Sequence, residues 1–204
     1  IQKEKFNKAN LHLSIDGSGS MSGGKFAKAI KSAVAVCKAS EMAGNISVTV
    51  DVRYTHDNKP VVIVIYDSKK DNMTHIKTYW KTLRAAGVTP ESLCFEAIMK
   101  KWLQGVNGED NYFINYSDGA PWFSTDDRTN VYYAGDRAVD HARKMVKMMK
   151  NNGLKIMSYF ISDGYMSDSD RTTFSKMYGK DASFIDCTNM MNVAKSMNQK
   201  FLQK

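Results

Sequence analysis

Cysteine is scarce in this chain, with only Cys37, Cys94 and Cys187 among 204 residues. The three are far apart and odd in number, and they form no CxxC or Cys/His pattern, which argues against a disulfide framework and against a structural zinc site. We expect them to be reduced thiols in the core of a cytoplasmic protein. The four histidines also fall at no metal-ligand spacing.

Long apolar runs are missing as well. No stretch approaches the ~18 residues that a transmembrane helix needs, and the first residues, IQKEK, lack the apolar core of a signal peptide. We therefore expect no membrane association. With 43% apolar and 25% charged residues, the composition is typical of a globular protein. We expect a single domain over residues 1–204. Such a domain is also compatible with being the C-terminal part of a longer chain.

The net charge of +8 raises nucleic acid as a partner. The basic residues are dispersed, however, and the densest groups, such as Lys144, Lys147 and Lys150, recur at helical spacing. Such spacing is typical of a solvated helix face. The sequence therefore gives little support to a nucleic-acid partner.

Short apolar runs alternate with segments of helical period. The predicted strands are 11–15, 46–54, 61–66, 111–116, 154–161 and 183–185. The predicted helices are 25–43, 73–86, 91–103, 136–151, 169–178 and 190–202. This order predicts an α/β fold: a doubly wound, mostly parallel six-stranded sheet with one antiparallel edge strand and helices on both faces, as in Rossmann-like folds.

Two neighbouring strands carry different patterns. In 46–54 apolar and polar residues alternate, which favours a half-covered strand at the sheet edge. The continuous apolar run 61–66 favours a strand buried on both faces, and a turn at 56–59 joins the two as a hairpin.

The polar and aromatic segment 122–135 is predicted to be a long loop.

Three polar loops follow strands or precede helices at the edge where such sheets bind ligands. The first contains Asp16, Ser18 and Ser20, the second contains Thr89, and the third contains Asp118. Carboxylates and hydroxyls without thiols or imidazoles suit a hard cation such as Mg²⁺, Mn²⁺ or Ca²⁺. The glycines between the first three residues let the backbone fold tightly around an ion. The sequence therefore predicts a divalent-metal site.

Two alternatives remain open for the first loop. Taken alone, it is also compatible with a plain turn and helix cap. It also fits the GxxxxGK pattern of a phosphate-binding loop from Gly19 to Lys25, and Asp67 would then serve as the acidic partner. Phe26 stands where that pattern needs Ser or Thr, which makes a P-loop-like nucleotide-binding protein the lesser alternative.

Together these residues resemble the metal-ion-dependent adhesion site (MIDAS) of a von Willebrand factor A (VWA) domain. That family's pattern is DxSxS after the first strand, a Thr in a middle loop and an Asp after the fourth strand. Asp16, Ser18 and Ser20 match the first part, Thr89 the second and Asp118 the third. The resemblance covers almost the whole chain. It implies direct metal ligation by the two serines, with the other three residues binding directly or through water.

Within that family, the loops Gly-Val-Thr-Pro-Glu and Tyr-Ser-Asp-Gly-Ala-Pro are similar to intracellular members, especially the CobT-type subunit of cobaltochelatase. Such members commonly work beside a MoxR-type AAA+ ATPase, so the resemblance implies a like partner. The 122–135 segment departs from a minimal domain. Its acidic pair at 126–127 fits plain surface charge, and its aromatic residues suit a partner-docking surface. These aromatic residues are Trp122, Phe123, Tyr132 and Tyr133.

Catalytic chemistry has little support in the sequence. His12 and His141 are not placed near the serines, so no nucleophile–base pair is predicted. Asp163, in a second Ser-Asp-Gly loop, is expected at the same sheet end as Asp118 but as loop structure rather than as a ligand. We therefore expect a non-catalytic, metal-dependent protein-interaction module that binds a partner's Asp or Glu. A second hypothesis makes the chain a non-catalytic subunit of an ATP-driven chelatase or remodelling complex.

Overall fold

A computed structural model describes residues 8–102, 110–125 and 131–202. Its main sheet has six strands in the order β3-β2-β1-β4-β7-β8, and every neighbouring pair is parallel except β2–β3. Their bounds are β1 Ala9–Asp16, β2 Ile46–His56, β3 Lys59–Asp67, β4 Asp110–Ser117, β7 Leu154–Ser162 and β8 Ala182–Asp186. The predicted six-stranded, mostly parallel sheet with one antiparallel edge strand is confirmed.

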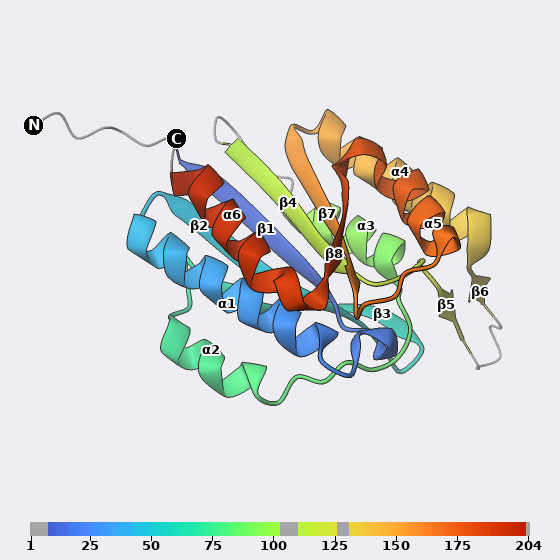
Figure 1. Cartoon of the computed structure of the whole chain (residues 1–204), viewed down its shortest axis with the longest axis horizontal. Coiled ribbons are helices and arrows are strands. Elements are labelled where there is room, and N and C mark those ends of the chain that lie inside the picture. The colour runs from blue at the N-terminus through green and yellow to red at the C-terminus, as the bar shows by residue number, and fades with distance from the viewer. Residues whose placement is uncertain (1–7, 103–109, 126–130, 203–204) are drawn as a thin grey trace, which may run out of the picture.

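Helices cover both faces of this sheet (Figure 1). One face packs against α1 (Lys25–Ala43), α2 (Met73–Trp80) and α6 (Met190–Leu202). The other packs against α3 (Glu91–Trp102), α4 (Gly135–Asn151) and α5 (Asp168–Tyr178). Each face has its own apolar core, because successive residues of a strand point to opposite sides of the sheet.

Local sequence signals explain several helix boundaries. The helix α5 starts at a capping box, in which Ser167 and Asp170 satisfy each other's backbone N–H groups. The helix α1 ends at Gly44, whose φ of 70° lies in the left-handed region that glycine adopts at little cost. These signals explain why both helices were predicted within a residue of their observed bounds.

The interpretation of the two hairpin strands was wrong in one respect. The strand β2 lies inside the sheet between β1 and β3, and β3 forms the edge. Its continuous apolar run is not buried throughout, since Ile63 is 43% and Val64 40% exposed. Conversely, the polar residues Asp51 and Arg53 of β2 are fully buried. The alternation in β2 therefore reflects a buried polar layer rather than contact with water.

Two other segments differ from expectation. The helix predicted for 73–86 stops at Trp80, because the backbone that follows bonds to the loop after β1 instead of continuing the helix. The predicted loop 122–135 contains a small two-stranded sheet of β5 (Phe123–Ser124) and β6 (Tyr132–Tyr133). The acidic pair at 126–127 lies outside the described residues.

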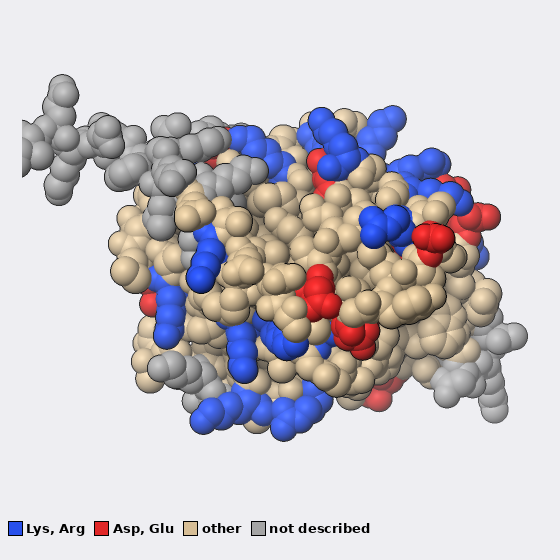
Figure 2. Space-filling model, in the orientation of Figure 1, with Lys and Arg blue, Asp and Glu red and all other residues tan. Residues whose placement is uncertain are grey.

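On the face in Figure 2, several Lys and Arg side chains lie toward the lower left, where α1 and α2 run in Figure 1, and most acidic side chains lie toward the centre and right. Among the described residues, none of the helices has the length and apolar character needed to cross a bilayer. The three cysteines are all buried and free, as expected.

Candidate metal site at the carboxyl ends of β1 and β4

The first predicted loop is held by the last residue of β1. Asp16 is fully buried, and its Oδ1 accepts a hydrogen bond of 2.8 Å from the backbone N–H of Ser18. This bond turns the chain into a short 3-10 helix, η1 (Gly19–Met21), which contains Ser20. Ser18 is buried and Ser20 is exposed, so the loop leads from the sheet interior to the surface.

The loop after β4 meets this first loop, because β4 lies beside β1 and runs parallel to it. Ser117 Oγ donates to Asp16 Oδ2 over 3.1 Å, and Ser20 Oγ donates to Asp118 Oδ1 over 2.7 Å. The hydroxyl oxygens of Ser18 and Ser20 lie 3.0 Å apart. The structure thus joins the side-chain oxygens of Ser18, Ser20 and Asp118 in one line. Asp16 is linked to the same two loops through the backbone N–H of Ser18 and the hydroxyl of Ser117.

The middle loop is tied to the first by main-chain hydrogen bonds. Gly19 N–H donates to Gly87 O at 2.9 Å, and Ala86 N–H donates to Gly17 O at 2.8 Å. Thr89 follows two residues after this attachment and is 93% buried from solvent, at 7% exposure. All three predicted loops therefore lie together at the carboxyl ends of the central strands, where open α/β sheets bind their ligands.

Gly17 allows this loop to lie against the neighbouring strand. A Cβ atom on Gly17 would lie 2.6 Å from Tyr54 Cε1, 2.7 Å from Val52 Cγ1 and 2.8 Å from Arg53 O. These separations are shorter than any carbon contact tolerates. The glycine is therefore required by close backbone packing against β2, which is a different reason from the approach to an ion that the sequence suggested.

The buried carboxylate of Asp16 favours a cation nearby. Burial raises its pKa to about 6; the guanidinium of Arg53 opposes this rise, and the charges of Asp118 and Glu91 add to it. A negative charge in such surroundings is stabilised by a positive one. Two carboxylates and three hydroxyls form an all-oxygen donor set that fits Mg²⁺ or Mn²⁺. In the described part of the chain, no group of three or more His, Cys, Asp or Glu side chains is arranged to hold a metal, and this site, with two carboxylates, relies on hydroxyls for its other ligands.

Lys25 is the functional neighbour that the sequence reasoning assigned only to the P-loop alternative. Its Nζ forms an ion pair with Asp118 Oδ2. In a P-loop the equivalent lysine would reach toward nucleotide phosphates. The next residue, Phe26, is buried in the apolar core under α1, at the position where a P-loop needs a metal-binding hydroxyl. These contacts disfavour the nucleotide-binding alternative.

A buried arginine that the sequence did not reveal as part of the site lies beneath it. Arg53 is buried in β2 directly opposite Asp16 in the β1–β2 register. Its guanidinium donates to Ser14 Oγ at 2.8 Å and to Glu91 Oε1 at 3.2 Å. Asn115 also donates to Glu91 Oε1, at 2.8 Å. The only sequence signal for this layer was the polar half of the alternation in β2.

The remaining candidates take no part in these contacts. Asp163 follows β7, which runs parallel to β4, so it lies at the same sheet end as Asp118, as predicted, and it is exposed as befits a loop residue. Asp67 pairs with Thr49 near the start of β2, at the far end of the sheet, where its side chain caps a turn and contacts Lys70. It therefore cannot serve a phosphate-binding loop after β1. His141 Nδ1 and the hydroxyl of Tyr133 are hydrogen-bonded to each other at 2.6 Å, away from the serines.

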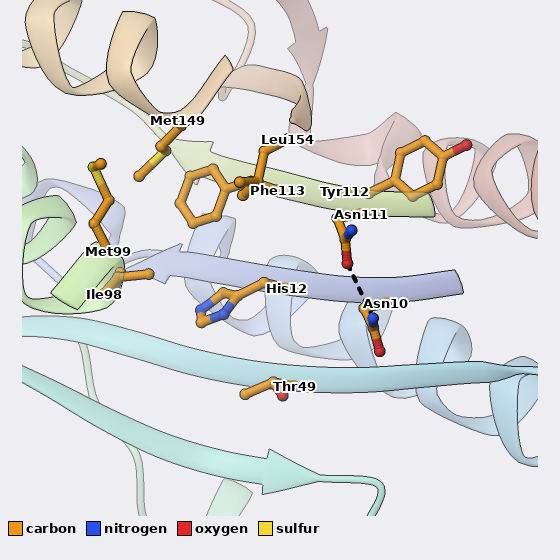
Figure 3. Close-up of a pocket in the computed structure, with 10 residues that line it drawn as sticks. All are labelled: Asn10, His12, Thr49, Ile98, Met99, Asn111, Tyr112, Phe113, Met149 and Leu154. Carbon is orange, nitrogen blue, oxygen red and sulfur yellow. Dashed lines mark hydrogen bonds between the residues drawn. The ribbon is translucent and has the colours of Figure 1, made fainter. Parts of the chain in front are cut away.

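A small cavity of about 70 Å³ lies on the α3–α4 side of the sheet, toward the starts of β1 and β4 (Figure 3). His12 points into it, and Asn10 donates to Asn111 Oδ1 at 3.0 Å along its wall. Inside the sheet, His12 Nε2 contacts Asp51 Oδ2, and Ser14 Oγ donates to Asp51 Oδ1 at 2.6 Å. The serine hydroxyl thus bonds to the carboxylate rather than to the imidazole, unlike a nucleophile–base pair.

Neither the protein-family models nor the curated protein sequences gave a match to this chain. Solved structures do resemble it. The pilus adhesin SpaC from Lactobacillus rhamnosus GG, in its open conformation, aligns with a TM-score of 0.73 at 12% identity, over 98% of this chain and 31% of that one. This chain therefore spans about a third of the adhesin.

Two further structures share the arrangement. A von Willebrand factor type A protein from Catenulispora acidiphila aligns with a TM-score of 0.62 at 14% identity, over 96% of this chain and 43% of that one. The manganese-loaded TRAP protein of Plasmodium vivax aligns with a TM-score of 0.63 at 15% identity, over 96% and 74%. The cobaltochelatase subtype finds no support in these structures. The likeness and the strand order together show that this chain has a von Willebrand factor A-like α/β fold.

Proposed function

We propose that this chain is a divalent-metal-dependent protein-interaction module whose metal recruits an acidic side chain of a partner. The observation that carries the proposal is the line of side-chain oxygens from Ser18 through Ser20 to Asp118, with separations of 3.0 and 2.7 Å. These oxygens come from two loops far apart in sequence that the sheet brings together. Manganese in the similarly folded TRAP protein adds support for a metal in this fold.

The donor set supports a receptor role. Asp16, Ser18, Ser20, Thr89 and Asp118 would hold the ion, and they include only two carboxylates. A bound Mg²⁺ or Mn²⁺ would supply an electrophilic centre that exchanges a water ligand for an outside carboxylate. The chain's own part is to place the oxygens and to bury Asp16 beneath them. We propose no catalytic step for it.

Aromatic surface beside the site fits a protein partner. The backbone N–H of Trp122 donates to Thr89 O at 2.8 Å, so Trp122 lies next to the middle loop, and its side chain is 44% exposed. Tyr132 is 68% exposed, whereas Phe123 and Tyr133 are buried in a small core of their own. Two of the four predicted docking residues are thus accessible. Aromatic residues of this kind are enriched in protein interfaces.

The proposal also covers the partner protein and the cellular location. A MoxR-type AAA+ ATPase is the partner class that the sequence resemblance suggests, within a cytoplasmic chelatase-like or remodelling complex. Three free buried thiols fit a reducing compartment. A pull-down of the ATPase with this chain, carried out with Mg²⁺ and with EDTA, tests that partner directly.

The metal itself is tested by titrating the protein with MnCl₂ and following free Mn²⁺ by electron paramagnetic resonance. We expect saturable one-to-one binding that Asp16→Ala and Asp118→Ala abolish while the circular dichroism spectrum is unchanged. Asp163→Ala, at the exposed end of β7, is the matched control and should bind normally.

Recruitment of a carboxylate is tested with a glutamate-rich peptide and a glutamine-rich peptide of the same length. Addition of the glutamate-rich peptide to the Mn²⁺-loaded protein should lower the relaxation rate of the water protons, because a carboxylate replaces an exchangeable water molecule bound to Mn²⁺. The glutamine peptide should have no such effect. Binding of the acidic peptide that persists unchanged in EDTA would overturn the proposed function.

A further inference from the structure

Lys25 occupies a position that the metal-site pattern does not assign to it. It is the first residue of α1, and its ammonium group pairs with Asp118 Oδ2. The Lys25 side chain is only 14% exposed and that of Asp118 only 1%. Because both charges are largely withdrawn from water, their attraction is weakly screened by solvent and salt.

The turn before α1 determines the position of Lys25 at the start of the helix. Gly23 and Gly24 have φ values of 75° and 126°, which L side chains rarely adopt. The two glycines let the chain reverse from η1 into the helix within a few residues. Lys25 therefore starts next to the serine loop and points back toward Asp118, and its neighbour Phe26 anchors this first turn of α1 in the core.

The two oxygens of Asp118 are divided between different groups. Oδ2 binds Lys25, and Oδ1 accepts from Ser20, whose hydroxyl also contacts Ser18. The lysine thus shares its carboxylate with side chains of the proposed metal site. A divalent ion bound by that site would lie near a fixed positive charge and would depend on the carboxylate that this charge already neutralises.

We propose that Lys25 is an intramolecular competitor of the metal ion, which neutralises Asp118 when metal is absent and lowers the affinity of the site. A divalent cation has to displace the ammonium group or bind against its repulsion. Lys25 thereby sets the metal concentration at which the site fills. This inference rests on the proposed metal-dependent function and adds the residue that tunes it.

An anchoring role for the same lysine has the opposite sign. If the ammonium group served mainly to hold Asp118 in place for the ion, its removal would weaken metal binding. Competition requires that its removal strengthen binding. The sign of the change in affinity therefore separates the two roles.

The experiment compares Lys25→Met with Lys28→Met in the full chain, using MnCl₂ titrations monitored by electron paramagnetic resonance. Lys28 lies one turn further along α1, where its Nζ donates to Cys187 Sγ at 3.3 Å. Its replacement removes the same charge from the same helix without touching Asp118. We expect Lys25→Met to bind Mn²⁺ about fivefold more tightly than wild type or better, and Lys28→Met to stay within about twofold.

A second readout is the rise in melting temperature that saturating Mn²⁺ produces, which should be larger for Lys25→Met than for wild type. It also reports directly whether the variant folds. Equal affinities for wild type and Lys25→Met, or weaker binding by the variant, would overturn the competitor role and leave the metal site standing. Absence of Mn²⁺ binding by all three proteins would overturn the proposed function, and the competitor role with it.

Discussion

Arg53 and Glu91 form a buried ion pair between β2 and the first turn of α3, with 3.2 Å between Nη2 and Oε1 and with side chains 1% and 0% exposed. Ser14 and Asn115 add hydrogen bonds to the two partners. The pair lies under Asp16, the innermost of the proposed ligands, and supplies the positive charge that faces that carboxylate from inside the sheet. It therefore connects the stability of the domain with the charge balance of the site.

Arg53→Met should lower the free energy of unfolding by about 3 kcal/mol, because it leaves the Glu91 carboxylate buried without its cation. Urea denaturation followed by circular dichroism measures the loss. The double variant Arg53→Met/Glu91→Gln should lose less than the sum of the two single variants. The control Arg143→Met, in an exposed pair with Asp140, should change stability by about 1 kcal/mol or less.

Asp16→Asn should stabilise the metal-free protein, since it removes a fully buried negative charge while keeping the side chain's shape. In EDTA near pH 7.5 we expect the free energy of unfolding to rise by about 1 kcal/mol. With saturating Mn²⁺ the order reverses, because only wild type gains from metal binding. Asp163→Asn should show neither effect. A destabilised Asp16→Asn variant in EDTA would contradict this account of the buried charge.

Gly17→Ala should destabilise the fold by about 2 kcal/mol and weaken Mn²⁺ binding, because its new methyl group would overlap Tyr54, Val52 and the backbone oxygen of Arg53. The loop that carries the serines would have to move away from β2. Gly119→Ala is the matched control: it lies in the loop beyond β4, and an added Cβ there meets no atom within 4 Å. Thermal melts and metal titrations of both variants check the prediction.

Thr89→Val removes one hydroxyl from the middle loop with almost no change in size. We expect Mn²⁺ affinity to fall by about tenfold, equivalent to roughly 1.4 kcal/mol, while the melting temperature in EDTA changes little. Thr82→Val, on an exposed turn after α2, serves as the control. Unaltered affinity in Thr89→Val would remove this residue from the ligand set and leave the other four.

Most of the fold could be predicted from periodicity, because its strands and helices carry strong local signals. The polar layer in β2 could not. Alternation says only that one face of a strand is polar, and water or a buried Arg53–Glu91 pair satisfies that face equally well. Likewise, the apolar run of β3 indicates a strand that packs against other elements. It does not reveal that β3 forms the edge of the sheet, where Ile63 and Val64 are partly exposed to solvent.

The candidate site shows the same division. Asp16, Ser18 and Ser20 could be picked out because they are close in sequence and follow a strand. Thr89 and Asp118 are far from these three in sequence. They could be added because the predicted sheet brings their loops to the same edge, and the family pattern then matched them. Lys25 was visible in the sequence but was assigned to phosphate binding. Its pairing with Asp118 depends on the direction in which α1 leaves its glycine turn, which spacing alone does not specify.

The main-chain bonds between Gly19 and Gly87 and between Ala86 and Gly17 have a kinetic consequence. Neither bond uses a side chain that would bind metal, so the two loops hold their relative position whatever the five ligand residues are doing. A site assembled in advance loses little conformational entropy on binding. Ion entry should then be limited by the release of water from the cation rather than by loop ordering, and Mn²⁺, which sheds water readily, should enter much faster than Mg²⁺.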